Sequence, residues 1–460
     1  MESLKNLFTV TDLRNRVLFT LAMLGVYRIG NHIPTPGVDI NALAAFADQL
    51  RQNTMFGLYD MFSGGNLSKV TIFALGIMPY ISSSIILQLL AVVWPYLERL
   101  SKEGELGRRK ITQYTRYGTI LLSLVQSLGI AYFLERNSAP GGFQLVANPG
   151  FGFRLMTVLT LTTGTCFIMW IGEQITDRGV GNGMSLIIYA GIVVGFPRAV
   201  LQTFDQMRTG QIGLLRILVL LVLMALVVAA IVFVERGHRR VTVQYAKRVV
   251  GRRMYGGSST HIPLKVNTGG VMPVIFAASI LAFPATIAGM FHGPFIEALI
   301  AQMMPGMPLY NLLYVVGIIF FTYFYTAIIF NPDDVAENMR KYGGFVPGIR
   351  PGKRTAEYID TILTRITAAG AVYLALIALL PTWMISGFKV APIPLVGEWL
   401  DALLPRVITE GMNVTYYFGG TSLLIVVGVA MDTVQQVESQ LIMRHYDGFM
   451  KKTRVRGRRA

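Results

Sequence analysis

The sequence predicts an all-α polytopic membrane protein whose ten transmembrane helices form two inverted five-helix halves. Composition is the first reason, since 53% of the 460 residues are hydrophobic and only 14% are charged. Ordinary soluble domains carry about a quarter charged residues, so a typical soluble enzyme is excluded. The second reason is the length of the apolar runs: Leu214 to Val234 contains one charge, Arg216, and can cross a bilayer as a helix. The third is a motif that recurs five spans apart.

Ten apolar windows, read in order along the chain, are the expected spans, and the fifth and tenth have the weakest pattern. Arg14 and Arg16 precede the first window and no small-residue cleavage site follows it, so we expect a retained helix rather than a removed signal peptide. The windows are residues 17–33, 70–97, 117–135, 154–172, 184–202, 213–234, 269–291, 310–330, 366–385 and 414–432.

The basic residues predict the orientation of these spans. Of the 41 Lys and Arg, 31 fall in the N-terminus, the C-terminal tail and the loops after even-numbered spans, and 10 fall in the other loops or in the ends of the spans beside them. Loops rich in Lys and Arg face the cytoplasm, so both termini are expected there. A missed or invented span would have disrupted this alternation, which supports the count of ten.

The recurring motif lies in the second and seventh spans. Residues 76–85 (GIMPYISSSI) and 270–280 (GVMPVIFAASI) read alike when one residue is inserted in the second copy. Because five is odd, the two copies enter the bilayer from opposite sides, as in an inverted repeat. Chance likeness between two apolar stretches is the alternative. Pro79 and Pro273 each remove a backbone donor inside a span, so both segments are expected to line the interface between the halves or a cavity there. A tolerated kink against a neighbouring helix is the other interpretation.

Several classes of function are disfavoured by what the spans lack. Their middles contain no Asp, Glu, Lys or His, which ion-coupled transporters usually keep there. The single cysteine, Cys166, excludes disulfides and paired-thiol sites, and the five histidines fall in loops without a catalytic motif. We therefore predict no catalytic residue, no metal and no cofactor. Gly179 to Gly183 resembles a phosphate-binding loop but follows a span rather than a strand, so a tight turn between spans is preferred.

The loop from Glu235 to Asn267 is predicted to be a basic hairpin in the cytosol. Val241, Val243 and Tyr245 alternate with polar residues as in a strand, and a second arm runs from 249 to 255 before a two-glycine break. Its eight basic residues suit contact with an RNA backbone. Topology determination together with attraction to anionic lipid is the equally weighted alternative.

The loop after the eighth span contains residues 343–354 (GGFVPGIRPGKR). Its prolines and glycines impose particular turns and hold Arg350 between Ile349 and Pro351. A held arginine suggests a docking contact, and an internal cap on nearby carbonyls is the alternative.

Together these motifs resemble the bacterial SecY family, nearly end to end. One departure is the stretch 385–413, whose three prolines make the loop before the tenth span longer than is usual for the family. The resemblance rests on residues 33–39 (IPTPGVD), 72–81 (IFALGIMPYI), 179–183 (GVGNG), 245–248 (YAKR), 260–267 (THIPLKVN), 345–352 (FVPGIRPG) and 418–425 (FGGTSLLI).

The resemblance implies the central subunit of a protein-conducting channel in the cell inner (cytoplasmic) membrane. Such a channel passes unfolded secretory polypeptides across the membrane and releases signal and transmembrane segments sideways into it. It is an hourglass pore with a lateral gate between spans 2 and 3 on one side and spans 7 and 8 on the other. It is not an enzyme, because a motor ATPase or a translating ribosome drives it.

The resemblance also implies a pore ring, whose positions in this chain are all isoleucine. An aliphatic constriction dewets and resists ions, yet offers no polar group to which a passing chain would adhere. Without the resemblance each residue reads as lipid-facing or as core packing. The ring positions are Ile77, Ile81, Ile188, Ile192, Ile275 and Ile425.

A plug helix is implied at about residues 56–69. The segment 55–62 is short and apolar on one side and is followed by a Gly64-Gly65 break, as suits a displaceable element. A fixed re-entrant segment is the alternative. Asn267 and Gln88 are the expected polar contacts across the closed gate, with simple packing as the alternative. The plug residues carried over are Phe56, Tyr59, Asp60, Met61, Phe62, Gly64, Gly65 and Lys69.

The implied partners are SecE and SecG in a heterotrimer, the SecA ATPase, the ribosome through its RNA backbone, signal sequences with nascent chains, and anionic lipids. Arg252 and Arg253 are the expected ribosome-docking residues, and Arg350 the expected SecA-docking residue.

The expected organisation is residues 1–202 with spans 1–5, residues 203–268 with span 6 and the hairpin, and residues 269–460 with spans 7–10, a cytoplasmic loop at 331–365 and the tail. A secondary transporter and a membrane-embedded enzyme are the competing hypotheses.

Overall fold

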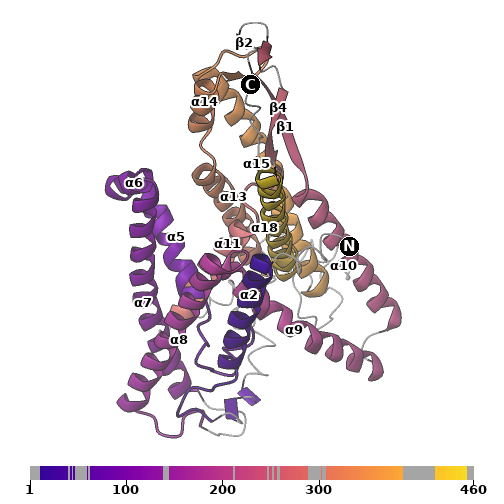
Figure 1. The fold of residues 1–460 in the computed structure, drawn as a ribbon. Helices are drawn as coiled ribbons and strands as arrows, with labels where there is room; N and C mark the ends of the chain where they lie inside the picture. Colours follow the sequence, from indigo (N-terminus) through magenta and orange to yellow (C-terminus); the bar gives the residue numbers. More distant parts are fainter. Residues whose placement is uncertain are drawn as a thin grey trace. The chain divides into compact units, whose positions relative to one another are not determined.

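The structure is a computed structural model. It describes residues 11–39, 42–43, 45–46, 60, 63–137, 144–210, 213–245, 248–250, 253–255, 259–288, 302, 307–386 and 420–452. These residues are mostly helical (Figure 1). Each of the ten predicted windows overlaps a helix. The helices are α2 (Thr11–Gly30), α5 (Met78–Val93), α6 (Pro95–Lys102), α7 (Glu105–Arg136), α8 (Phe151–Arg178), α9 (Gly183–Arg208), α10 (Leu214–Glu235), α11 (Met272–Ala288), α13 (Pro308–Ile329), α14 (Pro332–Lys341), α15 (Lys353–Ser386) and α18 (Gly420–Lys452).

Six helical stretches within the described residues are long and apolar enough to cross a membrane, and a bent pair would make a seventh. That pair is α5 and α6, which meet at an angle of 99°. α10 is the most apolar of the six and the least buried, with 17% of its window inside the structure. A helix that exposes apolar residues on most sides suits lipid rather than water. The chain is a multi-pass membrane protein.

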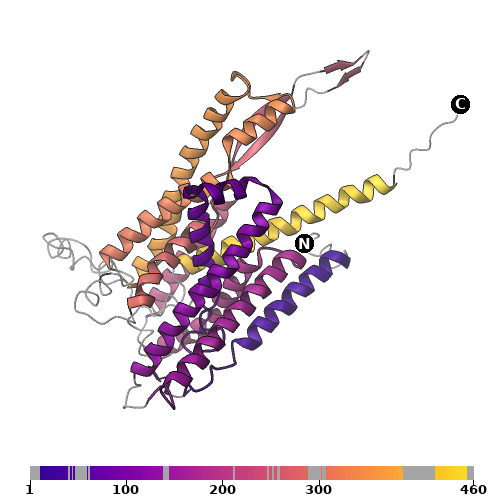
Figure 2. The same ribbon diagram turned by 90° about the vertical axis from the view of Figure 1, so that its left-hand side faces the viewer.

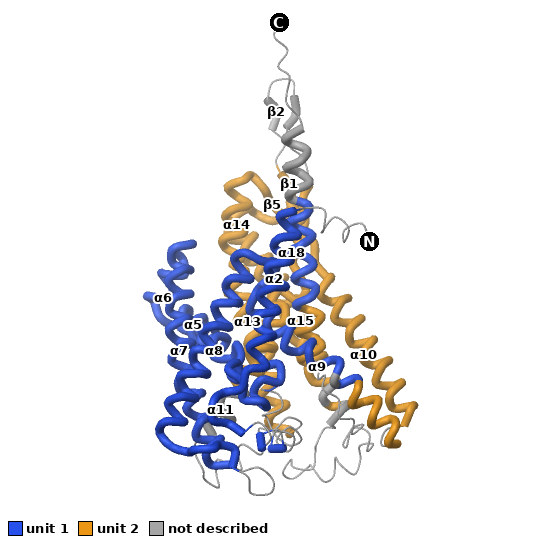
Figure 3. The backbone as a smooth tube through the Cα atoms, turned by 60° about the horizontal axis from the view of Figure 1, so that its bottom comes forward, with its two compact units in different colours: residues 1–200, 282–301, 429–460 blue, residues 201–281, 302–428 orange. Residues whose placement is uncertain are grey.

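The chain divides into two compact units, coloured separately in Figure 3. Unit 1 comprises residues 1–200, 282–301 and 429–460, and unit 2 comprises residues 201–281 and 302–428.

In unit 1, α7 and α8 form a long hairpin that is tied at both ends by ion pairs. Near one end Arg116 Nε lies 2.8 Å from Glu173 Oε1, and near the other Arg154 Nε lies 2.7 Å from Glu135 Oε2. α5 packs against α7, where the Ser83 hydroxyl donates to the Thr115 carbonyl at 2.9 Å. Small buried residues line the α7 face, so the helix backbones can approach closely, as in other membrane bundles.

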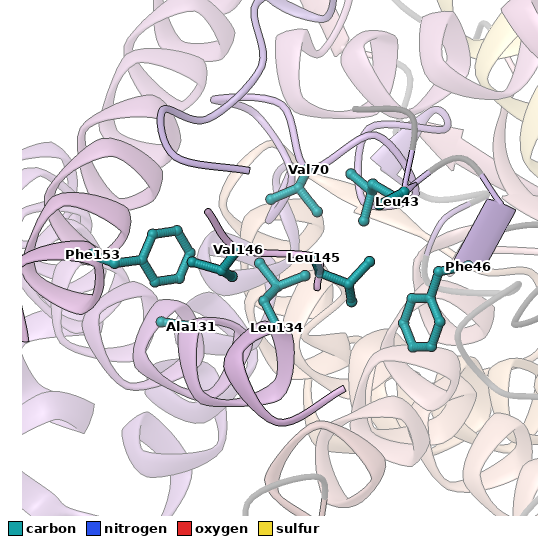
Figure 4. Packing of buried hydrophobic residues seen from close by; sticks show 9 residues of the cluster. Leu43, Phe46, Val70, Ala131, Leu134, Leu145, Val146 and Phe153 are labelled. Atoms are coloured by element: carbon teal, nitrogen blue, oxygen red, sulfur yellow. The ribbon is translucent and has the colours of Figure 1, made fainter. Parts of the chain in front are cut away.

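A hydrophobic cluster closes the Glu135 end of this hairpin (Figure 4). It joins the last turn of α7, the start of α8 and the segment that leads from α2 toward α5. Two isolated β-bridges, Pro34 with Thr71 and Val38 with Val146, hold these connecting segments together. The buried members are Ala42, Leu43, Phe46, Val70, Ala131, Leu134, Leu145, Val146 and Phe153.

The glycine-rich turn between α8 and α9 is a tight connection, as predicted. A Cβ added to Gly183 would lie 1.9 Å from the Gly172 carbonyl oxygen, so only glycine fits there. The Val180 amide donates to the Thr20 hydroxyl at 3.1 Å, which attaches the turn to α2. The motif therefore serves close helix packing.

The second predicted span begins later than expected. Residues 72–77 form turns, and the helix α5 begins at Met78 with Pro79 in its first turn. Proline is well placed there, because the first amides of a helix have no internal acceptor. The expectation that Pro79 removes a backbone donor from inside a helix was therefore wrong, and so was the same expectation for Pro273, the second residue of α11.

In unit 2, the predicted hairpin is confirmed, but its pairing differs from the expectation. β1 (His238–Tyr245) pairs with β4 (Ser259–Lys265), in register from His238 opposite Lys265 to Gln244 opposite Ser259. The expected second arm instead folds on itself as β2 (Arg248–Val250) and β3 (Arg253–Tyr255). Figure 2 shows this second ribbon beyond the end of the larger sheet. β4 was not predicted because it contains Pro263, and proline is uncommon within strands. An edge strand such as β4 tolerates proline.

A third strand joins the sheet from a distant part of the chain. β5 (Gly344–Phe345) pairs with the other edge of β1, which gives the order β4-β1-β5. The two loops that were predicted separately therefore share one sheet.

Candidate channel lining and docking surface

All six isoleucines expected at the pore ring are buried. Each has at most 7% of its surface exposed, which argues against a lipid-facing position. Ile77, Ile81, Ile188 and Ile192 belong to unit 1, and Ile275 and Ile425 belong to unit 2. Their assembly into one ring remains a prediction.

The two copies of the sequence motif adopt the same local backbone. Gly76 has a φ of 56° and Gly270 a φ of 58°, and each stands two residues before a helix that starts with Met-Pro. The Ile81 amide donates to the Ile77 carbonyl at 3.1 Å, and the Ile275 amide donates to the Val271 carbonyl at 3.2 Å. Glycine is the residue that adopts positive φ without strain. Equal geometry at equal positions favours a true repeat over chance likeness.

Part of the expected plug segment is a buried, hydrogen-bonded turn. The carboxylate of Asp60 accepts the Ser68 amide at 2.8 Å, and the Asp60 carbonyl accepts the Gly65 amide at 2.7 Å. Asp60 is 1% exposed, as are Ser63 and Asn66. Buried polar groups are costly unless they are paired, so these bonds are what allow a non-helical segment in the interior.

Two neighbours hold this turn within unit 1. The Tyr27 hydroxyl of α2 donates to the Ser63 carbonyl at 3.4 Å. Gly64, with a φ of 76°, lies against Gly191 of α9, and a Cβ on Gly64 would come within 2.8 Å of the Gly191 Cα. Tyr27 and Gly191 were not singled out from the sequence, because no local pattern connects residues so far apart.

The remaining plug residues are placed unevenly. Gly65 has a φ of 80° and open space around it, and Lys69 is exposed. The next residue, Val70, is the one non-glycine with positive φ among the described residues, at 42°. Phe56, Tyr59, Met61 and Phe62 lie outside the described residues.

The two polar residues expected at the gate bond within their own units. The Gln88 amide donates to the Ser84 hydroxyl at 3.0 Å, one turn earlier on α5. The Asn267 amide donates to the Glu235 carboxylate at 3.1 Å and to the Gly270 carbonyl at 3.0 Å. The gate role of both residues remains a prediction.

The loop between α10 and α11 and the loop between α13 and α15 pack around one hydrophobic core. This small body, which we call the docking body, consists of the sheet β4-β1-β5, α14 and the first turns of α15. β1 and β4 contribute alternate side chains, and α14 and α15 cover them. The buried core residues are Val241, Val243, Leu264, Met339, Val346 and Ile359.

Arg350 is exposed on this body while its backbone is fixed. Its carbonyl accepts the Thr355 hydroxyl at 2.9 Å, and the preceding Ile349 packs against the core. None of the ion pairs found within the described residues includes Arg350. Arg253 begins β3 opposite Val250, whereas Arg252 lies outside the described residues. Within the described part of the chain no cluster of His, Cys, Asp or Glu could hold a metal ion.

Comparison with known proteins decides the family. A family model for SecY matches residues 71–434. Protein translocase subunit SecY of Escherichia coli (strain K12) is 50% identical over 450 residues, which cover 97% of this chain and 96% of the relative. The subunit of the same name from Aquifex aeolicus (strain VF5) is 45% identical over 98% of this chain and 100% of the relative.

The chain belongs to the SecY family. Solved structures share its fold, including "The structure of a protein conducting channel", with a TM-score of 0.61, 15% identity and coverage of 93% of this chain and 92% of the other. In a second, the plug domain of a SecY protein is said to stabilise the closed state of the translocation channel (TM-score 0.60, 16% identity, 93% and 92% covered). A third is Sec61 in the canine ribosome-channel complex (TM-score 0.59, 15% identity, 93% and 92% covered). The family is one of channel subunits and not of enzymes.

We expect Asp60→Ala to loosen the turn at residues 60–68, because the buried Ser68 amide then loses its acceptor. A buried unsatisfied donor costs about 1–3 kcal/mol, so exchange of the Ser68 amide should accelerate by about tenfold or more. Hydrogen exchange in detergent measures this directly. Asp60→Asn keeps an acceptor oxygen and is the matched control. Equal protection in the alanine variant, the asparagine variant and the parent would contradict the role of this carboxylate.

Proposed function

We propose that this chain is the channel-forming subunit of a protein translocase in the cell inner membrane, with both termini in the cytoplasm. It passes unfolded secretory polypeptides through its centre and releases signal and transmembrane segments sideways. The observation that carries the proposal is the relation, over nearly the full length of both chains, to proteins named translocase subunits.

The character of the spans supports a passive channel. The span middles lack ionisable groups, whereas a coupled transporter would need them to carry its ions. Six buried isoleucines at the expected constriction would form a seal that excludes ions by dewetting and still presents no polar group to a translocating chain. Residues 56–69 would add a plug beside that seal, with α5 and α7 on one side of a lateral gate and α11 and α13 on the other.

The docking body supports a division of labour between two partners. The basic ribbon β2–β3, with Arg252 and Arg253, would meet the phosphates of ribosomal RNA, and a ribosome-channel complex of canine Sec61 is a precedent. Arg350, on a fixed backbone, would dock the SecA motor. SecE and SecG would complete the heterotrimer, and the basic loops would also meet anionic lipid.

Ile425→Asn and Ile275→Asn test the seal. A polar side chain in an aliphatic constriction favours wetting, so the closed channel should conduct ions in planar bilayers. A gate that starts closer to open also needs less binding energy from its ligand, so export of a reporter with a weakened signal sequence should rise.

Leu220→Asn is the matched control, since Leu220 is also buried, at 3% exposed, but lies on α10 outside the proposed ring. If all three variants were equally tight to ions and equally strict about signal sequences, the six isoleucines would not form the seal.

Charge reversal separates the two docking sites. Arg252→Glu with Arg253→Glu should weaken ribosome binding and flatten its dependence on salt, because fewer counterions are released. Arg350→Glu should impair SecA-driven export and leave ribosome binding intact. The measurements are ribosome binding over a salt series and export into vesicles. Loss of both activities in both variants would point to collapse of the docking body instead of two contacts.

A further inference from the structure

A buried carboxylate lies where the docking body joins the membrane helices. Glu235 is the last residue of α10 and is 9% exposed. A negative charge at the C-terminal end of a helix is unfavourable, because the helix dipole is negative there. Glu235 accepts a hydrogen bond from the Asn267 amide at 3.1 Å, and such a bond to a charge offsets part of that cost.

The same amide reaches the start of α11. Asn267 donates its second hydrogen to the Gly270 carbonyl at 3.0 Å, and Gly270 leads directly into α11. Between Glu235 and Asn267 the chain forms the β1–β4 hairpin, whose base is closed by the Val266 amide donating to the Gly237 carbonyl at 3.0 Å. One side chain thus links the end of α10, the base of the hairpin and the beginning of α11.

We propose that Glu235 is a positioning residue that couples the docking body to α11. By holding the Asn267 amide against the Gly270 carbonyl, it fixes the first turn of α11 to the hairpin base. A partner that binds the hairpin and displaces its base then moves the helix that carries Ile275. This proposal rests on the function proposed above, in which the hairpin binds the ribosome and α11 borders the gate.

Packing against the hairpin base makes such coupling effective. Gly370 of α15 leaves room for the Val266 carbonyl, which would be 2.8 Å from an added Cβ. Val266 and Asn267 are therefore held on one side by α15 and on the other by the Gly237 contact. A base clamped in this way transmits a displacement instead of absorbing it.

Hydrogen exchange of the amides from Val274 to Ala278 tests the link without any ligand. In Glu235→Ala, exchange at these amides should accelerate about tenfold, as expected for one lost hydrogen bond to a charged group. Glu235→Gln retains an acceptor oxygen and should stay within about threefold of the parent. Glu337→Ala removes an exposed carboxylate from α14 of the same unit, paired with Lys341 at 3.1 Å, and should change nothing in α11. Parental exchange in Glu235→Ala would overturn the proposal.

Purified ribosomes then test the coupling itself. In the parent and in Glu235→Gln, ribosome binding should change exchange at the start of α11, whereas Glu235→Ala should bind ribosomes with unchanged affinity and show no such change. A ribosome-induced change that persists in Glu235→Ala would overturn the coupling. If ribosomes fail to bind the parent, the docking proposal fails, and the ligand-free comparison still decides whether Glu235 positions α11.

A double variant in which the two residue types are swapped controls for misfolding of the alanine variant. In Glu235→Gln with Asn267→Asp the donor and acceptor trade places, so the bond can form again. Exchange in α11 should be slower in this double variant than in Asn267→Asp alone, where two carboxylates face each other. Equal hydrogen exchange in the single and double variants would show that no specific hydrogen bond between residues 235 and 267 holds α11.

Discussion

A bilayer offers no hydrogen bonds to a polypeptide backbone, and this constraint shapes every part of the structure. Most of the described chain satisfies it with helices. Exceptions among the described residues lie in the segments that precede α5 and α11. There side chains supply the missing partners: Asp60 accepts the Ser68 amide, and Asn267 donates to the Gly270 carbonyl. Because each such bond is buried, removing one partner leaves the other without a hydrogen bond, and this destabilises the non-helical segment.

Buried hydrogen bonds also connect the docking body to α10 and α11. Two loops that are about a hundred residues apart in sequence share one sheet and one hydrophobic core, so Arg350 and the β1–β4 hairpin belong to a single body. That body emerges from α10 and returns directly into α11. Under the proposed function, a partner bound to the loops would act on the membrane helices through a short, hydrogen-bonded path.

Sequence reasoning succeeded where the determining force is local. Apolar runs located a helix at every predicted span, and alternation along residues 241–245 located β1. It failed where the partner is distant. β4 contains Pro263, which argues against a strand, and β5 is only two residues long. The hydrogen-bond partners of Asp60 and Glu235 lie too far away in the sequence for any periodicity to predict them. The position of Pro79 within its helix was predicted wrongly, because the sequence does not distinguish a proline in the interior of a helix from one in its first turn. The positive φ of Gly76 shows that the helix begins only after this glycine. The ring positions came from family likeness alone.

If the buried isoleucines form the constriction, a translocating polypeptide passes between them. A photo-crosslinking amino acid placed at Ile81, Ile188, Ile275 or Ile425, one at a time, tests it most directly when a secretory chain is stalled in transit. Adducts to the stalled chain are expected from all four positions and none from Leu220, which is also buried, on α10. Adducts from Leu220 as strong as those from the isoleucines, or none from the isoleucines, would contradict it.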